Sequence, residues 1–166
     1  MSFNEIEEKL KNFEIEIFSE KDHVKEEIEE IEKKYEIKLP DDYKQFLLKY
    51  GASMICDDDV FYKSLEQDTW SEDEFQVVEF FYGLEETELD LDIQDKIDSY
   101  AERFPEGIIP IASSPFGNEI CLQAKGDDIG KIYFWDHEYR KSEGDFFLVA
   151  NTFTDFIKSL VKKVIV

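Results

Sequence analysis

One helix is delimited at both ends by the segment Leu39-Pro40-Asp41-Asp42-Tyr43-Lys44-Gln45-Phe46-Leu47-Leu48-Lys49-Tyr50-Gly51. Proline is favoured at the first positions of a helix, and the two aspartates after it suit the positive end of the helix dipole. The apolar side chains recur every three or four residues and so share one face: Tyr43, Phe46, Leu47 and Tyr50. Gly51 suits the left-handed residue that ends many helices. We therefore predict a helix whose apolar face is buried against a sheet.

Apolar spacing predicts further helices on either side of this segment. Val24, Ile28, Ile31 and Tyr35 are separated by four, three and four residues, which is the stripe of an amphipathic helix. A third helix is predicted from about residue 91 and ends before Pro105, because a residue that precedes proline is disfavoured in the helical conformation. Between these helices we expect short strands at 53–56 and 60–62, and a central strand at 75–82 that is apolar on both faces.

The last third of the chain has the pattern of an antiparallel sheet. Short β-type runs at 108–112, 119–122, 131–135 and 146–150 are separated by glycine-containing turns, which predicts a meander. Asn151 is a suitable N-cap for a final helix whose apolar stripe continues to Val161. We therefore predict an α+β fold, an antiparallel sheet flanked by helices, in a single domain over residues 1–166 with 1–19 as an N-terminal extension.

Composition and charge exclude several classes of protein. The 166 residues are 42% hydrophobic, which is enough apolar material for one folded core. The net charge of −22 excludes direct binding to nucleic acid, since phosphate contacts need lysine and arginine, and it disfavours an anionic membrane surface. The first residues have no basic segment followed by an apolar run, and no stretch is apolar enough to span a membrane. We therefore expect a cytoplasmic protein in which Cys56 and Cys121 remain free, buried thiols.

The residues needed for common catalytic and metal chemistry are sparse. His23 lies in a charged stretch where we expect it to be solvated, and the strand neighbours of His137 point to opposite faces. The sequence has no nucleophile elbow, no phosphate-binding glycine loop and no Cys-x-x-Cys pair. The acidic stretch from Asp90 fails the calcium-loop pattern, because Asp95 stands where that loop needs glycine. We predict no catalytic residue, no metal site and no cofactor.

The negative charge is concentrated in the middle third of the chain. Residues 51–104 carry 17 acidic and 3 basic side chains, whereas residues 1–50 carry 15 and 9, and residues 105–166 carry 9 and 7. An ordinary solvated face would mix both signs, since like charges repel in the compact state. We interpret the middle third as a binding face for a basic partner, with Trp70 either as an anchor or as a packing residue. The residues expected to contact the partner are Asp57, Asp58, Asp59, Asp68, Trp70, Glu72, Asp73 and Glu74.

Several short segments follow one another in a characteristic order between residues 20 and 161. After the helices of 24–35 and 39–51 come Ile109-Pro110-Ile111-Ala112, Gly117-Asn118-Glu119-Ile120-Cys121-Leu122, Gly130-Lys131-Ile132-Tyr133-Phe134-Trp135-Asp136-His137-Glu138 and Leu148-Val149-Ala150-Asn151-Thr152-Phe153-Thr154-Asp155-Phe156. Together they resemble the SUKH superfamily, also called the Smi and Knr type. The chain departs from the family where Gly51-Ala52-Ser53 replaces a frequent pair of glycines, and where Pro115-Phe116 replaces a more polar pair before Gly117.

The resemblance implies a bacterial immunity protein, or antitoxin, that neutralises a toxin of a contact-dependent or secreted polymorphic system, often a nuclease. The matching residues are capping, turn and core positions, so the resemblance implies an architecture and no catalytic residue. Such a toxin would carry a basic surface, which agrees with the acidic charge of this chain. The alternative is an intracellular regulatory or scaffold protein of the same fold with no toxin partner. An immunity gene is expected to lie beside a toxin gene, which separates the two.

Overall fold

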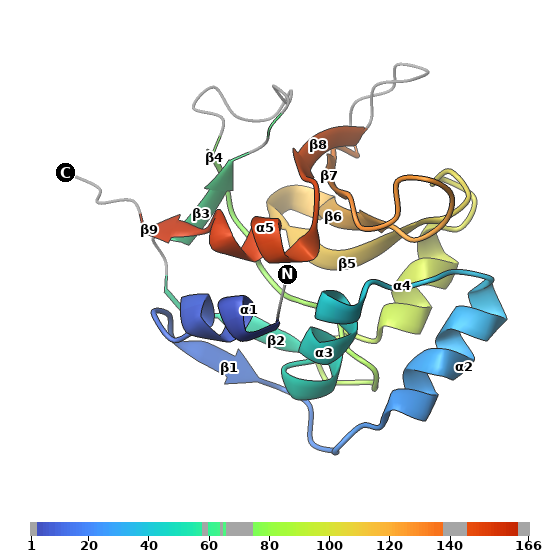
Figure 1. Ribbon diagram of the computed structural model, residues 1–166, viewed down its shortest axis with the longest axis horizontal. Helices are drawn as coiled ribbons and strands as arrows, with labels where there is room; N and C mark the ends of the chain where they lie inside the picture. The colour runs from blue at the N-terminus through green and yellow to red at the C-terminus, as the bar shows by residue number, and fades with distance from the viewer. Residues whose placement is uncertain (1–2, 58–59, 64, 66–74, 138–145, 163–166) are drawn as a thin grey trace.

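A computed structural model of residues 1–166 describes all of the chain except 1–2, 58–59, 64, 66–74, 138–145 and 163–166 (Figure 1). In the described residues the α-helices are α1 (Phe3–Leu10), α2 (Lys25–Tyr35), α3 (Asp41–Lys49), α4 (Ile93–Tyr100) and α5 (Phe153–Lys158). Helix α3 begins after Pro40, and Gly51 takes a φ of +56° two residues after its end, so the limits predicted for this helix are confirmed. None of these helices is both long and apolar enough to cross a membrane.

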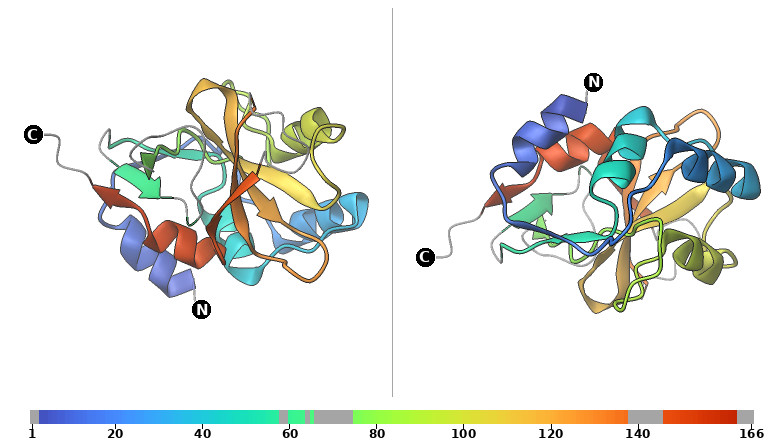
Figure 2. Two further views of the ribbon diagram at one scale, coloured as in Figure 1. Left: turned by 90° about the horizontal axis from the view of Figure 1, so that it is seen from above. Right: turned by 90° about the horizontal axis from the view of Figure 1, so that it is seen from below.

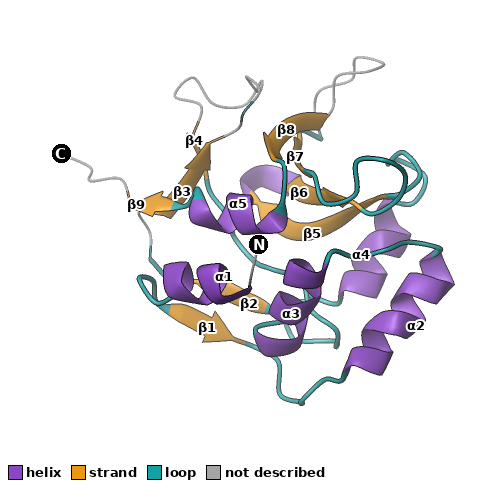
Figure 3. Cartoon of the chain, viewed as in Figure 1, coloured by secondary structure: helices purple, strands orange, loops and turns teal. Residues whose placement is uncertain are grey.

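The largest group of paired strands in the described residues is a four-stranded antiparallel sheet (Figure 3). Its strands follow in chain order as β5 (Ile108–Ser114), β6 (Asn118–Gln123), β7 (Ile132–Trp135) and β8 (Phe146–Ala150). Ile120 lies opposite Ala112 of β5 and opposite Phe134 of β7. A short 3₁₀ turn, η1 (Pro115–Gly117), joins the first two strands. The predicted meander and the α+β class are therefore confirmed.

Two smaller antiparallel groups complete the strand pairing. Strand β1 (Ile15–Ile17) pairs with β2 (Ser53–Ile55), while β3 (Val60–Lys63) pairs with both β4 (Phe75–Gln76) and β9 (Val161–Lys162). The sequence had indicated that the apolar stripe of the last helix continues to Val161. This was wrong, because Val161 lies in β9 and is 43% exposed. Helix α5 is capped by Thr152, whose hydroxyl accepts a hydrogen bond from the backbone N–H of Asp155 at 3.0 Å, and not by Asn151.

The segment predicted as one central strand, 75–82, is interrupted. Only β4 is regular strand, but Phe81 bridges Ser53 of β2 to Ala112 of β5, so this part of the chain does lie between the smaller sheet and the larger one. The backbone N–H of Phe81 donates to the carbonyl of Ser53 at 2.8 Å. The carbonyl of Val77 accepts a hydrogen bond from the hydroxyl of Ser114 at 2.7 Å. The central position was predicted correctly and the continuous strand was wrong.

The main core lies between the sheet and the layer of α1, α3 and α5. The Phe46 ring of α3 packs with its centroid 4.9 Å from that of Phe81 and 5.0 Å from that of Phe153. The predicted face of α3 is buried except for Tyr50, which is half-buried and packs at the edge. Helix α1 lies alongside α5 (Figure 2), where it contributes Ile6 to the core. The N-terminal segment is thus packed into the fold.

The opposite face of the sheet carries a second, aromatic cluster. The Trp135 ring lies 5.4 Å from that of Tyr100 and 5.0 Å from that of Phe104, measured between ring centroids. Cys121 is fully buried in this cluster, whereas Cys56 is half-buried near β2, and both thiols are free. The prediction of free thiols is confirmed, and full burial holds for Cys121 alone.

Candidate functional site

The predicted partner-binding residues fall mostly outside the described part of the chain. Residues 58–59 and 66–74 lie outside the described residues, and with them lie seven predicted contacts: Asp58, Asp59, Asp68, Trp70, Glu72, Asp73 and Glu74. Asp57 is the one predicted contact that lies among the described residues.

Asp57 is engaged within the fold. One carboxylate oxygen, Oδ2, accepts a hydrogen bond from the backbone N–H of Glu14 at 2.9 Å. The other, Oδ1, lies 3.7 Å from the ammonium nitrogen of Lys162, and the side chain is 20% exposed. Asp57 therefore links the residues before β1 to β9. Because a hydrogen bond to an ionised group contributes to stability, neutralising Asp57 would disturb the fold as well as any encounter with a partner.

The described part of the middle third carries most of its acidic side chains on the loop 84–92 and on α4. Residues 84–104 carry eight acidic and two basic side chains. The charge of the middle third had indicated an acidic face, but the aspartate run and the composition around Trp70 drew the prediction to 57–59 and 68–74. No spacing marks 84–92 as a folded loop. The loop is closed at its base, since the N–H of Gly83 donates to Leu91 O and the N–H of Ile93 donates to Gly83 O, each at 2.8 Å.

Glycine is required at the base of this loop by close packing. A Cβ atom on Gly83 would lie 2.3 Å from the backbone nitrogen of Ala52, well inside the contact limit. The base of the loop therefore rests directly on the chain entering β2. This packing positions the acidic side chains of the loop relative to the rest of the fold.

An open hollow of about 650 Å³, which we call the acidic hollow, lies between the residues around Phe18 and this loop. Four of its lining side chains are glutamates, and none is basic; the lining consists of Phe18, Glu20, Glu85, Glu86, Thr87, Glu88 and Leu89. Leu89 is 49% exposed and offers an apolar surface beside the carboxylates. Lysine and arginine combine an apolar stem with a charged head, so the hollow has the chemistry to accept such a side chain.

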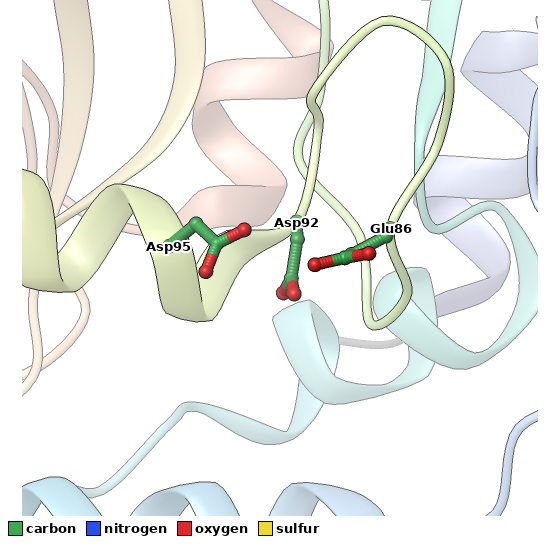
Figure 4. Close-up of side chains that lie close together, drawn as sticks. All are labelled: Glu86, Asp92 and Asp95. Carbon is green, nitrogen blue, oxygen red and sulfur yellow. The ribbon is translucent and has the colours of Figure 1, made fainter.

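Three carboxylates converge beside the hollow (Figure 4). Oxygens of Glu86, Asp92 and Asp95 all lie within 4.8 Å of one another. Asp92 also caps α4, where it accepts a hydrogen bond from the backbone N–H of Gln94 at 3.0 Å. Burial and the neighbouring acids raise the pKa of Asp92, although this hydrogen bond lowers it. Calcium takes six to eight oxygen ligands, and three carboxylates from the described residues do not complete such a shell.

His23 is held between two carboxylates. The prediction that it is solvated was therefore wrong. Its ring is 5% exposed; Nδ1 lies 2.9 Å from Oε2 of Glu27 and Nε2 lies 2.9 Å from Oε1 of Glu85. Burial lowers the pKa of His23, but the two carboxylate hydrogen bonds outweigh burial and raise it above the ordinary value of 6.5. The pKa of Glu27 is lowered, first by its hydrogen bond from the backbone of Val24 and also by His23. The sequence offered no signal for this, because Glu85 lies 62 residues away.

A second titratable group, Glu119, is buried on the aromatic face of the sheet. Its side chain is 3% exposed and accepts a hydrogen bond from the hydroxyl of Tyr82 at 2.5 Å. Burial raises the pKa of Glu119 to about 8, against the smaller opposing effects of Tyr82 and of the positive charge of Lys96. His137 is also engaged, with Nδ1 2.7 Å from Oδ1 of Asn118. Among the described residues, neither Glu119 nor His137 lies in a group of metal-binding side chains.

The meander and the helical layer define a small α+β domain, which carries an acidic loop at 84–92. The family model described as SMI1 / KNR4 family (SUKH-1) matches residues 25–159, and the chain therefore belongs to this family. The chain is similar to the SPbeta prophage-derived uncharacterized protein YokK of Bacillus subtilis (strain 168). The two are 45% identical over 172 residues, which cover 97% of this chain and 87% of that protein.

Proposed function

We propose that this protein is an immunity protein that binds and neutralises a cognate bacterial polymorphic toxin, a nuclease, in the cytoplasm. Membership of the SMI1 / KNR4 (SUKH-1) family supports the proposal, since that family is known for toxin-immunity proteins. The similar Bacillus subtilis protein is described as prophage-derived, and its function is uncharacterized. The observation that carries the proposal for this chain is its acidic face, with eight acidic and two basic side chains in residues 84–104 and a hollow lined by four glutamates.

The proposed mechanism is occlusion by charge. A nuclease must present lysine and arginine side chains to the phosphates of its substrate, so its active groove is basic. An acidic face is attracted to such a groove and can cover it, and it associates quickly because opposite potentials steer the encounter. We propose that the contact includes the acidic hollow together with the residues predicted from the sequence: Asp57, Asp58, Asp59, Asp68, Trp70, Glu72, Asp73 and Glu74.

The toxin is proposed to be inhibited by binding, without turnover. The sequence carries no common nucleophile, nucleotide or zinc motif that would support catalysis. In the proposed mechanism each toxin molecule is neutralised by a fixed number of immunity molecules. The proposal therefore makes a stoichiometric prediction that an enzyme would not fulfil.

The test uses the purified product of a toxin gene adjacent to the gene for this protein. Its nuclease activity should fall linearly as this protein is added and should be abolished at a fixed molar ratio. Progressive loss of activity at a much smaller ratio would indicate an enzyme. A toxin that is neither bound nor inhibited would favour the regulatory or scaffold alternative.

Charge variants test which face makes the contact. Glu86→Gln with Glu88→Gln removes two charges from the loop, and Glu29→Gln with Glu30→Gln removes two from the exposed side of α2 as the matched control. Glu32 is unsuitable for the control, since it accepts a hydrogen bond from the Leu39 N–H at 2.8 Å. The loop variant should slow association more than the control, and the difference should shrink as salt shortens the Debye length towards ~8 Å. Equal slowing by both variants would mean that only the net charge matters.

A further inference from the structure

We propose that His23, in its charged form, is a latch that holds together the two walls of the acidic hollow. The latch is a property of the free protein. Its bearing on the binding of a partner rests on the proposed function, because the same walls form the surface proposed to contact the toxin.

The geometry around the His23 ring requires both of its nitrogens to donate. Each nitrogen lies 2.9 Å from a carboxylate oxygen, one of Glu27 and one of Glu85. An ionised carboxylate can only accept, and a neutral imidazole carries only one N–H. The neutral ring would therefore turn a lone pair towards one of the two carboxylates. Two simultaneous hydrogen bonds of this kind are those of an imidazolium.

One of the two carboxylates lines the hollow, and the other lies in α2, the helix that follows the segment of the opposite wall. Glu85 begins the lining on the side of the loop 84–92, and its Oε1 also accepts a hydrogen bond from the backbone N–H of Lys21 at 3.3 Å. Glu27 lies in the first turn of α2, and its Oε2 also accepts from the backbone N–H of Val24 at 2.8 Å. The charged ring thus joins the loop to the segment that supplies Phe18 and Glu20 to the other wall. The charged ring adds a second link between these distant segments to the hydrogen bond that Lys21 donates to Glu85.

The charges that act on His23 give the latch its dependence on pH. Among the described residues the charged groups that face the ring are Glu27 from α2 and Glu85 from the loop, while Lys21 and Asp22 beside it in the chain are exposed. Because the pKa of His23 is raised, the stabilisation is complete below the ordinary value of 6.5 and is lost as the pH rises through the raised pKa. Above that pH, two carboxylates face each other across a neutral ring and repel.

Nitrogen NMR of the two histidines tests the charge of the ring directly. The chain has only His23 and His137, so the His137→Gln variant identifies the signals of His23. Titration from about pH 5 to about pH 9 should show His23 with both ring nitrogens protonated at pH 6 and with a pKa above 6.5. A His23 ring that is neutral at pH 6 would overturn the proposal.

Matched glutamine variants separate the latch from general charge. Glu85→Gln removes a bonded carboxylate, whereas Glu86→Gln removes the same charge from the next residue, which forms none of the contacts to His23. The pKa of His23 should fall clearly in the Glu85→Gln variant and much less in the Glu86→Gln variant. An equal fall in both would show that the ring responds to the acidic surroundings and not to a specific ion pair.

Hydrogen exchange tests whether the proton holds the walls. After correction for the intrinsic effect of pH, amides of 18–24 and 84–92 should open about tenfold more often at pH 9 than at pH 6, the effect of losing one charge-assisted hydrogen bond. The His23→Gln variant should show the open level at both pH values, while its β6 amides should exchange as in the wild type at each pH, because the ionisation of Glu119 is common to both proteins. Wild-type protection that does not change with pH would refute the latch. Both measurements use the free protein, so their failure would leave the proposed toxin binding untouched.

Discussion

Replacing Glu119 by glutamine should stabilise the protein at neutral pH. The carboxyl group is 3% exposed on the aromatic face of the sheet, and burial raises its pKa to about 8. In the folded protein it is therefore mostly protonated at pH 7, whereas in the unfolded chain it ionises near its ordinary pKa of 4.5. Folding must then take up a proton, which becomes harder as the pH rises. Glutamine has nearly the same shape, carries no proton to lose, and keeps an oxygen that can accept the hydrogen bond from Tyr82.

The size of the effect follows from the two pKa values of Glu119. The free energy of holding the proton is about 1.4 kcal/mol for each pH unit between 4.5 and 7, which gives about 3 kcal/mol. A carboxyl group whose pKa is raised by folding does not lower the free energy of unfolding below pH 4.5. It lowers this free energy progressively up to about pH 8, and by a constant amount above that. The Glu119→Gln variant should therefore match the wild type at low pH and be more stable by about 3 kcal/mol at pH 7.

Urea unfolding of both proteins between about pH 4.5 and pH 8.5 measures this difference. The contribution of His23 to the pH dependence is common to both proteins and cancels in the comparison. Glu102→Gln, which removes an exposed carboxylate after α4, is the control and should change stability by less than about 0.5 kcal/mol. A stability difference that does not grow with pH would show that Glu119 is ionised in the folded protein.

Three further substitutions test the packing. Phe46→Ala should lower the free energy of unfolding in a denaturant titration by about 3 to 5 kcal/mol, because the ring fills the core between Phe81 and Phe153; a loss below about 1 kcal/mol would contradict that position. Gly83→Ala should lower it by about 1 to 3 kcal/mol, since the new Cβ atom would meet the backbone nitrogen of Ala52; an unchanged thermal midpoint would contradict this. Phe116→Gly should raise it by about 0.5 to 1 kcal/mol, because Phe116 is 75% exposed at a φ of +67° that glycine adopts without strain; a lower midpoint would contradict this.

Helices and meander strands could be predicted because their signals are local. The limits of α3 are set by Pro40, two aspartates and Gly51, all within one short segment, and its buried face follows from side-chain spacing. The errors have two sources: a choice between neighbouring capping residues, and contacts between distant parts of the chain. Thr152 caps α5 in place of the equally suitable Asn151. Beyond β4, the carbonyl of Val77 accepts from the hydroxyl of Ser114, 37 residues away, and such a contact leaves no periodic pattern in the sequence.

For the candidate site, the sequence predicted only that its charge is negative. The distribution of acidic residues placed the predicted binding face in the middle third of the chain. The loop 84–92, however, is shaped by the packing of Gly83 against Ala52 and by hydrogen bonds between its two ends, which no periodic pattern reveals. The partners of His23 are equally hidden, since Glu85 is brought to it by the fold. A histidine in a charged stretch is usually exposed, and the tertiary contact reversed that expectation for His23.

The acidic loop contains carboxylates with different relations to the fold. Glu85 holds His23, Asp92 caps α4, and Asp90 lies 3.6 Å from the ammonium nitrogen of Lys96. Glu86 and Glu88 form no such contact with the described residues, and their like charges oppose compaction. Carboxylates that do not support the fold are the ones from which charge can be removed without unfolding the protein. A change in association rate on neutralising Glu86 and Glu88 therefore reports on partner recognition, whereas the same change at Glu85 or Asp92 would also report on the loop that carries them.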